Sequence, residues 1–335
     1  MSEAPASHKS SSLGETRTYS VHGVHVSIHA DWSEFLALSD LMFGVFHPQG
    51  DTTETLSVDV GLQVRGWFDS PAGRIERQDA EERLGTNEFV GSGTARYAAG
   101  KLDVRYTDGR DAHVSASYIL DRSSRLRRIV GRPESWDDEY ALFRLAVHEP
   151  VLLKLERRGG VVLHASAVSR GGRALVLVGL NGGGKSTLCA SLLDRLDYVS
   201  DNFVVLDGKR VLGFPSALRM PGPPAAGSRD LPAAHGKHFL RPDPGRSRTT
   251  GDAQALVFLS LGGATSLTPL TPDEAFRRLL QVQDMTHEFP RHTYLGPLAL
   301  PPKFTSLEAI SEEVAAYRLV VSRTNDARDQ VLSLV

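Results

Sequence analysis

Apolar and polar residues alternate along the first 130 residues of the chain in a way that is typical of half-buried strands. The segments that show it best are VHGVHVSIHA (21–30), LSVDVGLQVRGWF (56–68), GKLDVRY (100–106) and AHVSASYIL (112–120). Asp108-Gly109, between the last two, indicates a hairpin turn. We therefore predict a β-rich accessory domain over residues 17–133, preceded by a flexible N-terminal segment over residues 1–16.

The apolar spacing becomes helical in RPESWDDEYALFRLAVHEPVLLKLERRGG (132–160). Ser135 is a suitable N-cap, and the aspartates after it lie in the first turn, where the helix dipole favours negative charge. Pro150 should bend or interrupt this helix, and Gly159-Gly160 should end it. We expect this helix to connect the accessory domain to a second domain. We predict that the second domain extends over residues 134–335 and includes the helix.

Buried strands and amphipathic helices alternate in the rest of the chain, which predicts an α/β domain. VVLHASAV (161–168) and ALVLVGL (174–180) read as strands, and the apolar character of both faces of the second predicts a helix-covered sheet. YVSDNFVVLD (198–207) indicates a further strand, with a hairpin turn at Asp207-Gly208. Residues 221–254 read as a long loop, ALVFLSL (255–261) as a strand, and Thr271 and Glu274 as the capping box of a helix. The tail predicts a strand, a turn and a helix.

The segment GLNGGGKST (179–187) matches the phosphate-binding pattern G-x-x-x-x-G-K-[ST] through Gly179, Gly184, Lys185 and Ser186. Glycines allow successive backbone N–H groups to turn toward an anion, and the following helix directs its positive dipole end at the same place. Lys185 would contact the terminal phosphates, and the Ser186 hydroxyl would bind Mg²⁺. We predict that ATP and Mg²⁺ bind here, held by Gly179, Asn181, Gly182, Gly183, Gly184, Lys185, Ser186 and Thr187.

Two further residues are candidates for catalysis because of their spacing from this loop. Asp201 ends a strand 16 residues after Lys185, where a carboxylate would lie beside the γ-phosphate and could accept a proton or help hold Mg²⁺. His164 lies on the strand before the loop, 15 residues before Gly179. Taken alone, Asp201 is equally compatible with a turn at a strand end, whereas a strand histidine such as His164 is more often a core residue.

The combination of His164, the Gly-rich loop and Asp201 resembles the catalytic domain of HPr kinase/phosphorylase, a bacterial P-loop serine kinase whose fold is related to phosphoenolpyruvate carboxykinase. The resemblance extends over roughly residues 155–275 and includes Pro244-Gly245-Arg246. It implies an α/β fold of this type, with Lys185 and Asp201 as catalytic residues, Asp201 serving as the base. It also implies that His164 orients Asp201 or the phosphate, and that Ser186 and Asn202 support Mg²⁺. Because HPr kinases are hexamers, it implies a homo-oligomer such as a ring or a dimer.

The chain departs from that family at two places. Asn202 stands where the family has a second aspartate, so it can offer a carbonyl oxygen to the metal but cannot act as a base. No Glu-Ile-Arg-Gly segment occurs between residues 208 and 240, so we do not expect the reverse phosphorolysis. In phosphoryl transfer, a positive side chain can stabilise the negative charge that develops on the transferred group. The candidates for this role are Arg219, Lys237, Arg241, Arg246 and Arg248. Of these we favour Arg219 and Arg246 as nucleotide contacts, against the alternative of solvated loop charges.

Composition narrows the partners and the compartment. The formal net charge is −2 over 335 residues, which gives no electrostatic reason to expect nucleic acid or an anionic membrane. Cys189 is the single cysteine, which excludes an internal disulfide and favours a reducing compartment. The sequence lacks an apolar run long enough to span a membrane, and its N-terminus lacks the apolar core of a signal peptide. We therefore expect a cytoplasmic protein. His22, His25 and His29 are not expected to bind metal, because strand alternation separates His22 from the other two.

We consider three functions on this basis. The first is a kinase that transfers the γ-phosphoryl group of ATP to a hydroxyl acceptor, either a serine of a protein or peptide or a small hydroxylated metabolite. The second is a nucleotide-binding regulatory switch without phosphotransferase activity. The third is a partner-binding module whose kinase site has decayed.

Overall fold

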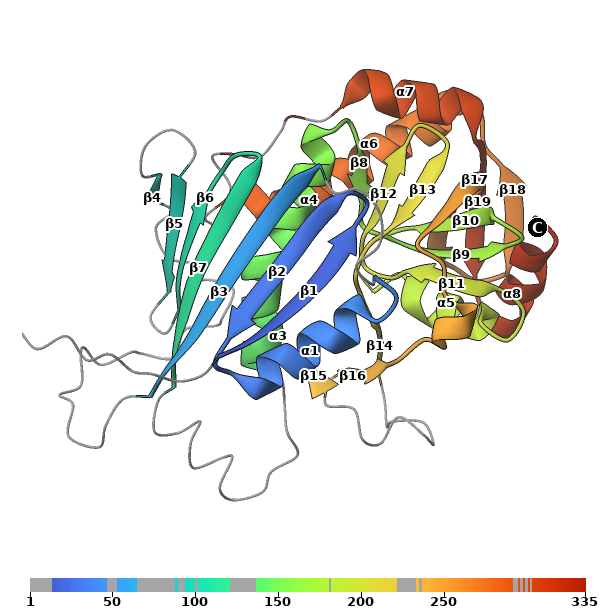
Figure 1. Ribbon diagram of the computed structural model, residues 1–335. Helices are drawn as coiled ribbons and strands as arrows, with labels where there is room; N and C mark the ends of the chain where they lie inside the picture. Colours follow the sequence, from blue (N-terminus) through green and yellow to red (C-terminus); the bar gives the residue numbers. More distant parts are fainter. Residues whose placement is uncertain are drawn as a thin grey trace, which may run out of the picture.

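The computed structural model describes residues 14–46, 53–64, 88–89, 94–99, 102–120, 137–180, 182–221, 233–234, 237–291, 295, 298, 301 and 303–335. Two large sheets lie side by side, one formed by the first third of the chain and the other by the second half (Figure 1). Among the described residues, no helix is both long and apolar enough to cross a membrane.

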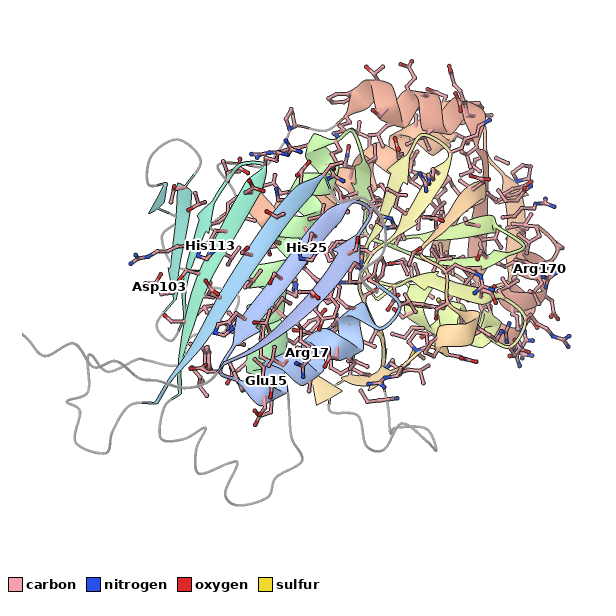
Figure 2. The ribbon with its side chains drawn as sticks, in the orientation of Figure 1. Glu15, Arg17, His25, Asp103, His113 and Arg170 are labelled. Carbon is pink, nitrogen blue, oxygen red and sulfur yellow. The ribbon has the colours of Figure 1, made fainter. Side chains whose placement is uncertain are left out.

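The N-terminal sheet has seven strands in the order β1-β2-β3-β7-β6-β5-β4. The strands are β1 (Glu15–Val21), β2 (Val24–Ala30), β3 (Glu54–Val64), β4 (Glu88–Phe89), β5 (Thr94–Ala99), β6 (Leu102–Thr107) and β7 (Asp111–Leu120). Helix α1 (Ser33–Phe43) joins the parallel neighbours β2 and β3, as a crossover between parallel strands requires. The inner side chains pack on the helices behind the sheet, and the outer face is polar, with His25, Asp103 and His113 along it (Figure 2).

The hairpin predicted at Asp108-Gly109 is confirmed by the antiparallel pairing of β6 and β7. The single strand predicted over 21–30 is wrong, because His22 and Gly23 both have positive φ and form a tight turn between β1 and β2. His22 thus lies in the turn, where its Nε2 is 2.6 Å from Gly213 O. Residues 1–13 lie outside the described residues, and β1 begins inside the segment predicted to be flexible.

The predicted connecting helix consists of three pieces, α3 (Asp137–Phe143), a π-helical turn η1 (Arg144–His148) and α4 (Glu149–Arg157). The predicted interruption at Pro150 is confirmed. Proline has no N–H to pair with the carbonyl one turn earlier, and the turn just before it is widened to the π form. Gly159, with φ of 108°, follows the end of α4 as predicted. Ser135, the predicted N-cap, lies outside the described residues.

The second sheet has nine strands, seven of them in the order β11-β9-β10-β17-β13-β12-β8, while β19 pairs with both β17 and β18. These are β8 (Val161–Leu163), β9 (Ala165–Arg170), β10 (Arg173–Val178), β11 (Asp197–Ser200), β12 (Val204–Asp207), β13 (Arg210–Gly213), β17 (Thr250–Leu261), β18 (Ser266–Pro269) and β19 (Ala315–Val321). Helices α5 (Lys185–Leu192) and α8 (Thr324–Leu332) cover one face, and α6 (Pro272–Arg291) and α7 (Phe304–Glu313) cover the other.

Two strands predicted as continuous are each broken at the same edge of this sheet. The segment predicted as one strand over 161–168 divides at His164 into β8, which pairs with β12, and β9, which pairs with β10 and β11. The strand predicted over 198–207 divides in the same way after Ser200, where Asn202 has a left-handed backbone with φ of 73°. The paired breaks bring the chain segments around His164 and Asn202 together.

The long loop predicted over 221–254 contains regular structure among its described residues. Strands β14 (Leu218–Pro221), β15 (Ala233–Ala234) and β16 (Lys237–Leu240) form a small third sheet, and Pro244–Arg246 form a single 3₁₀ turn, η2. Leu218 and Leu240 pack with Leu188 of α5 in one apolar cluster, which explains why the segment folds back onto the second sheet.

Packing is continuous across the predicted division at residue 133. One apolar cluster contains the inner face of the N-terminal sheet, helices α1, α3 and α4, and Val205, Leu212 and Phe214 of the second half. The Lys154 ammonium on α4 also donates to Glu54 of β3 at 3.0 Å and to Gly109 O at 2.8 Å. The two-domain division therefore stays a prediction, and α4 belongs to the cores of both parts.

Candidate active site

Three strand ends meet at one edge of the second sheet. Strand β9 runs antiparallel to both of its neighbours, β10 and β11, so the last two run parallel to each other. The carboxyl ends of β10 and β11 therefore lie beside the amino end of β9. Gly179 follows β10, Asp201 follows β11, and Ser166 is the second residue of β9. Sheet topology alone thus brings these three segments together.

The predicted strand and helix are present on either side of the Gly-rich loop, as β10 and α5. Gly182 and Gly184 have φ of 75° and 83°, a conformation that residues with a Cβ adopt with strain. Gly184 is also the N-cap of α5, so no side chain at this position caps the first N–H groups of the helix. Among the other predicted contacts, Gly179 is buried, Gly183 donates to Leu180 O at 3.1 Å, Thr187 is exposed, and Asn181 lies outside the described residues.

Lys185 is folded back onto the loop. Its Nζ lies 2.8 Å from Gly179 O and 3.0 Å from Leu180 O, and the residue is only 6% exposed. Burial lowers the pKa of this ammonium to about 8; Asp201 opposes the change, and the positive charge of Lys237 on β16 adds to it. Lys185 is therefore a buried cation at the start of α5, and the positive charge of Lys237 contributes to its lowered pKa.

Asp201 is held at the start of α5 by hydroxyl groups. The Ser186 hydroxyl is 3.0 Å from both carboxylate oxygens, and the Ser166 hydroxyl is 2.5 Å from Oδ1. The backbone of Asp201 is fixed as well, because its N–H donates to Ser216 Oγ at 3.1 Å. The carboxylate is therefore oriented toward the loop rather than into the apolar interior.

His164 and Asn202 occupy the two strand breaks and contact each other. His164 Nδ1 lies 2.8 Å from the backbone carbonyl oxygen of Asn202, and the His164 N–H donates to Thr286 Oγ1 of α6 at 2.9 Å. The imidazole also meets the ring of Phe203 edge to face, with centroids 6.2 Å apart. His164 is thus fixed beside the segment that carries Asp201, and the half-buried Asn202 directly follows that carboxylate.

The contacts of the two favoured arginines lie elsewhere. The Arg219 guanidinium stacks over the Tyr140 ring of α3, 4.4 Å from its centroid. Arg246 donates to Leu196 O at 3.1 Å and lies 3.6 Å from Asp197, at the beginning of β11. Because Asp201 follows the end of that strand, the two positions are separated by about 13 Å along it. The contacts of Arg246 are therefore with residues at the start of β11 and not with the Gly-rich loop. Among the five basic candidates, Lys237 is the one whose positive charge contributes to the lowered pKa of Lys185.

Ser166 and Ser216 are the contacts of Asp201 that sequence reasoning missed. Both are buried serines in otherwise apolar segments. A buried hydroxyl needs a partner, so an isolated serine two residues after His164 in a buried strand was the available signal. It gave no indication of which residue the partner would be.

The side chains at this edge suit a magnesium-bound triphosphate. An uncapped helix start and a lysine ammonium are groups that bind phosphate oxygens. The Ser186 hydroxyl and the Asp201 carboxylate are oxygen donors, and Mg²⁺ typically uses one or two protein carboxylates with water and substrate phosphates as its other ligands. Within the described part of the chain, no group of three or more His, Cys, Asp or Glu side chains could hold a metal ion.

The sequence matches no protein-family model and no curated protein. Among solved structures, it is similar to the Hpr(Ser) kinase/phosphatase from Coxiella burnetii, with 12% sequence identity over 52% of this chain and 92% of that chain. The TM-score is 0.26, which does not establish a shared fold. The function proposed below therefore depends on the contacts of the site itself.

Proposed function

We propose that this chain is a phosphotransferase that binds ATP with Mg²⁺ at the loop 179–187 and transfers the γ-phosphoryl group to a hydroxyl acceptor. The observation that supports it best is the contact between Ser186 and Asp201 at 3.0 Å, at the first turn of α5. A loop of this kind binds phosphate, and a carboxylate on its serine hydroxyl adds the second oxygen donor that a metal-bound triphosphate needs.

The loop and α5 bind the β- and γ-phosphates in this proposal. The first N–H groups of α5 point out of the helix toward the loop, and phosphate oxygens would accept from them. Lys185 now donates to two loop carbonyls. On nucleotide binding it would exchange these for phosphate oxygens, which restores its full positive charge because an adjacent anion favours the protonated form.

Asp201 and Ser186 would hold Mg²⁺ together. The Ser186 hydroxyl donates a hydrogen bond to Asp201, so the lone pairs of its oxygen remain available to bind the metal. Asp201 would bind the ion directly or through a water molecule, and the predicted contribution of Asn202 adds one further oxygen. Bound Mg²⁺ neutralises charge that develops on the phosphate oxygens.

The transfer step requires a proton acceptor. As the acceptor oxygen bonds to the γ-phosphorus, the bond from phosphorus to the β–γ bridging oxygen breaks, and the hydroxyl proton passes to a base. Asp201 is the base in our proposal, with His164 fixed beside it through Asn202. The acceptor class is a serine of a protein or peptide, or a small hydroxylated metabolite.

A nucleotide-dependent switch is the second candidate, and one observation favours it. Lys154 of α4 and Arg158, the residue after this helix, both bond to Glu54 of the N-terminal sheet, and the chain continues through a short turn and the three residues of β8 to His164. A change at the nucleotide site therefore has a short, packed route to the N-terminal sheet. In this case water, rather than an alcohol, would accept the phosphoryl group.

The test is transfer from γ-labelled ATP and Mg²⁺ to serine-containing peptides, free amino acids and sugars. We expect label on an acceptor, and loss of transfer in Lys185→Ala but not in Lys209→Ala, an exposed lysine paired with Glu313 at 3.6 Å. Release of labelled phosphate at the same rate with and without acceptors would favour the switch. A chain that binds no nucleotide would contradict both candidates.

A further inference from the structure

Ser166 is a buried hydroxyl that faces the proposed metal site. It lies on β9, between the strand that precedes the Gly-rich loop and the strand that precedes Asp201, and it has no exposed surface. Its Oγ is 2.5 Å from Asp201 Oδ1. Since a carboxylate can only accept, the Ser166 hydroxyl is the donor.

The two serines that contact Asp201 constrain it differently. Ser186 is equidistant from both carboxylate oxygens at 3.0 Å, so it does not distinguish one from the other. Ser166 is bonded to Oδ1 alone. The hydrogen bond from Ser166 directs Oδ1 toward β9 and so fixes the rotation of the carboxylate about its Cβ–Cγ bond. Oδ2 then faces Ser186 and the start of α5.

We propose that Ser166 is a positioning residue that fixes the Asp201 carboxylate for metal binding and thereby sets the affinity of the nucleotide-loaded site for Mg²⁺. This inference rests on the proposed function. A residue that orients a metal ligand by a hydrogen bond typically changes metal affinity by about 10–100-fold when it is removed. Ser166 acts through Asp201 and is not itself placed on substrate.

The same strand supplies a matched control. Ser169 lies three residues further along β9 and is also buried, yet its Oγ has no hydrogen-bond partner among the described residues. Ser166→Ala and Ser169→Ala remove the same atom from the same strand at similar burial. A general effect of serine loss on the sheet would appear in both variants, whereas an effect on Asp201 would appear only in the first.

The experiment measures the affinity of the full-length chain for ATP by calorimetry over a range of Mg²⁺ concentrations, and the binding of Mn²⁺ to the ATP-loaded chain by electron paramagnetic resonance. We expect S166A to raise the half-saturating metal concentration about 10-fold or more, and S169A to leave it unchanged. Ser166→Cys has nearly the same size and a weaker donor, so it should give an intermediate value, and it serves the same test if S166A does not fold.

An S166A or S166C chain that folds and keeps the metal dependence of the wild type would overturn the role of Ser166 alone. Equal losses in S166A and S169A would overturn it as well, because a general packing effect would then explain both. A wild-type chain that bound ATP with no dependence on a divalent cation would instead overturn the proposed function. Failure of the inference and failure of the proposed function are therefore distinguishable.

Discussion

The hydroxyl of Ser186 lies 3.0 Å from both carboxylate oxygens of Asp201, although 15 positions separate the two residues in sequence. The contact follows from the unit β10–α5–β11. Strands β10 and β11 run parallel on either side of β9, so the start of α5 and the end of β11 meet at one edge of the sheet. A substitution at Asp201 should therefore change the hydrogen bonding of Ser186 in the first turn of α5.

The first test concerns Asp201→Asn. We expect phosphoryl transfer to an acceptor to fall about 100-fold or more, because the neutral amide holds Mg²⁺ poorly and accepts no proton. Binding of ATP at saturating Mg²⁺ should largely survive, since the loop and Lys185 are unchanged. The measurement is the transfer rate beside nucleotide affinity. Asp197→Asn, at the other end of β11, is the control and should transfer normally. A D201N chain with the wild-type rate would refute the assigned role.

A second test uses the pKa of Lys185, which burial lowers to about 8 in the nucleotide-free chain. Triphosphate binding needs the ammonium form, so affinity should fall only about two-fold from pH 7 to pH 8. Above pH 8 it should fall by up to about 10-fold for each pH unit, as the free chain loses this proton. Binding titrations between pH 7 and 9.5 measure the effect.

Lys185→Arg is the matched variant, because a guanidinium stays charged over this whole range. Its affinity is expected to be lower than that of the wild type, since the fork-shaped head group fits the loop differently, but it should not vary with pH above 8. If the wild type binds ATP equally well at pH 7 and pH 9.5, Lys185 is not the group that pairs with the phosphates.

Much of the second sheet could be predicted from the sequence. The strand before the loop, the helix after it, the hairpin at Asp207-Gly208 and the final strand, turn and helix are all present. So is the capping box of α6, in which the N–H of Thr271 donates to Glu274 at 2.9 Å. These features depend on local chemistry, that is, on runs of apolar residues, on glycine at positive φ and on short-range hydrogen bonds.

The breaks at His164 and Asn202 could not be predicted, because they depend on pairing between distant segments. Val161–Leu163 and Ala165–Arg170 are both apolar enough to read as one strand, and only their separate partners, β12 and β10, divide them. The partner of Ser166 was hidden for the same reason. A sequence pattern reports which side chains are buried, whereas sheet order decides which of them meet.

A third test concerns Lys154, whose ammonium is buried between helix α4 and the N-terminal sheet. It donates to Glu54 at 3.0 Å, to Gly109 O at 2.8 Å and to Arg110 O at 3.2 Å. Lys154→Met should lower the free energy of unfolding by about 3 kcal/mol, because two backbone carbonyls lose their donor and Glu54 keeps only Arg158. Chemical denaturation measures this.

Lys209→Met provides the comparison, since that lysine is 56% exposed and its ion pair with Glu313 is solvated. We expect a change of less than about 0.5 kcal/mol there. Similar stability losses in both variants would mean that the Lys154 contacts contribute no more than a surface pair.

The last test concerns His148, which lies in the π-helical turn and is buried between Phe143 and Phe214. Burial lowers its pKa to about 3, with smaller contributions of the same sign from Arg144 and Arg219 and an opposing one from the Pro215 carbonyl. The unfolded chain takes up a proton at this residue below about pH 6.5, whereas the folded chain does so only near pH 3. Stability should therefore fall as the pH is lowered through this window, by up to about 1.4 kcal/mol for each pH unit.

His148→Met removes the titrating group and leaves a flexible apolar side chain in its place. We expect its unfolding free energy to fall less steeply than that of the wild type between pH 6.5 and pH 4, even if its stability at pH 7 is lower. His113→Gln is the control for the loss of a surface imidazole, because that ring is 45% exposed on the outer face of the N-terminal sheet. Parallel pH profiles for the wild type and H148M would show that the proton uptake arises at other groups, and that the aromatic enclosure of His148 is a packing feature only.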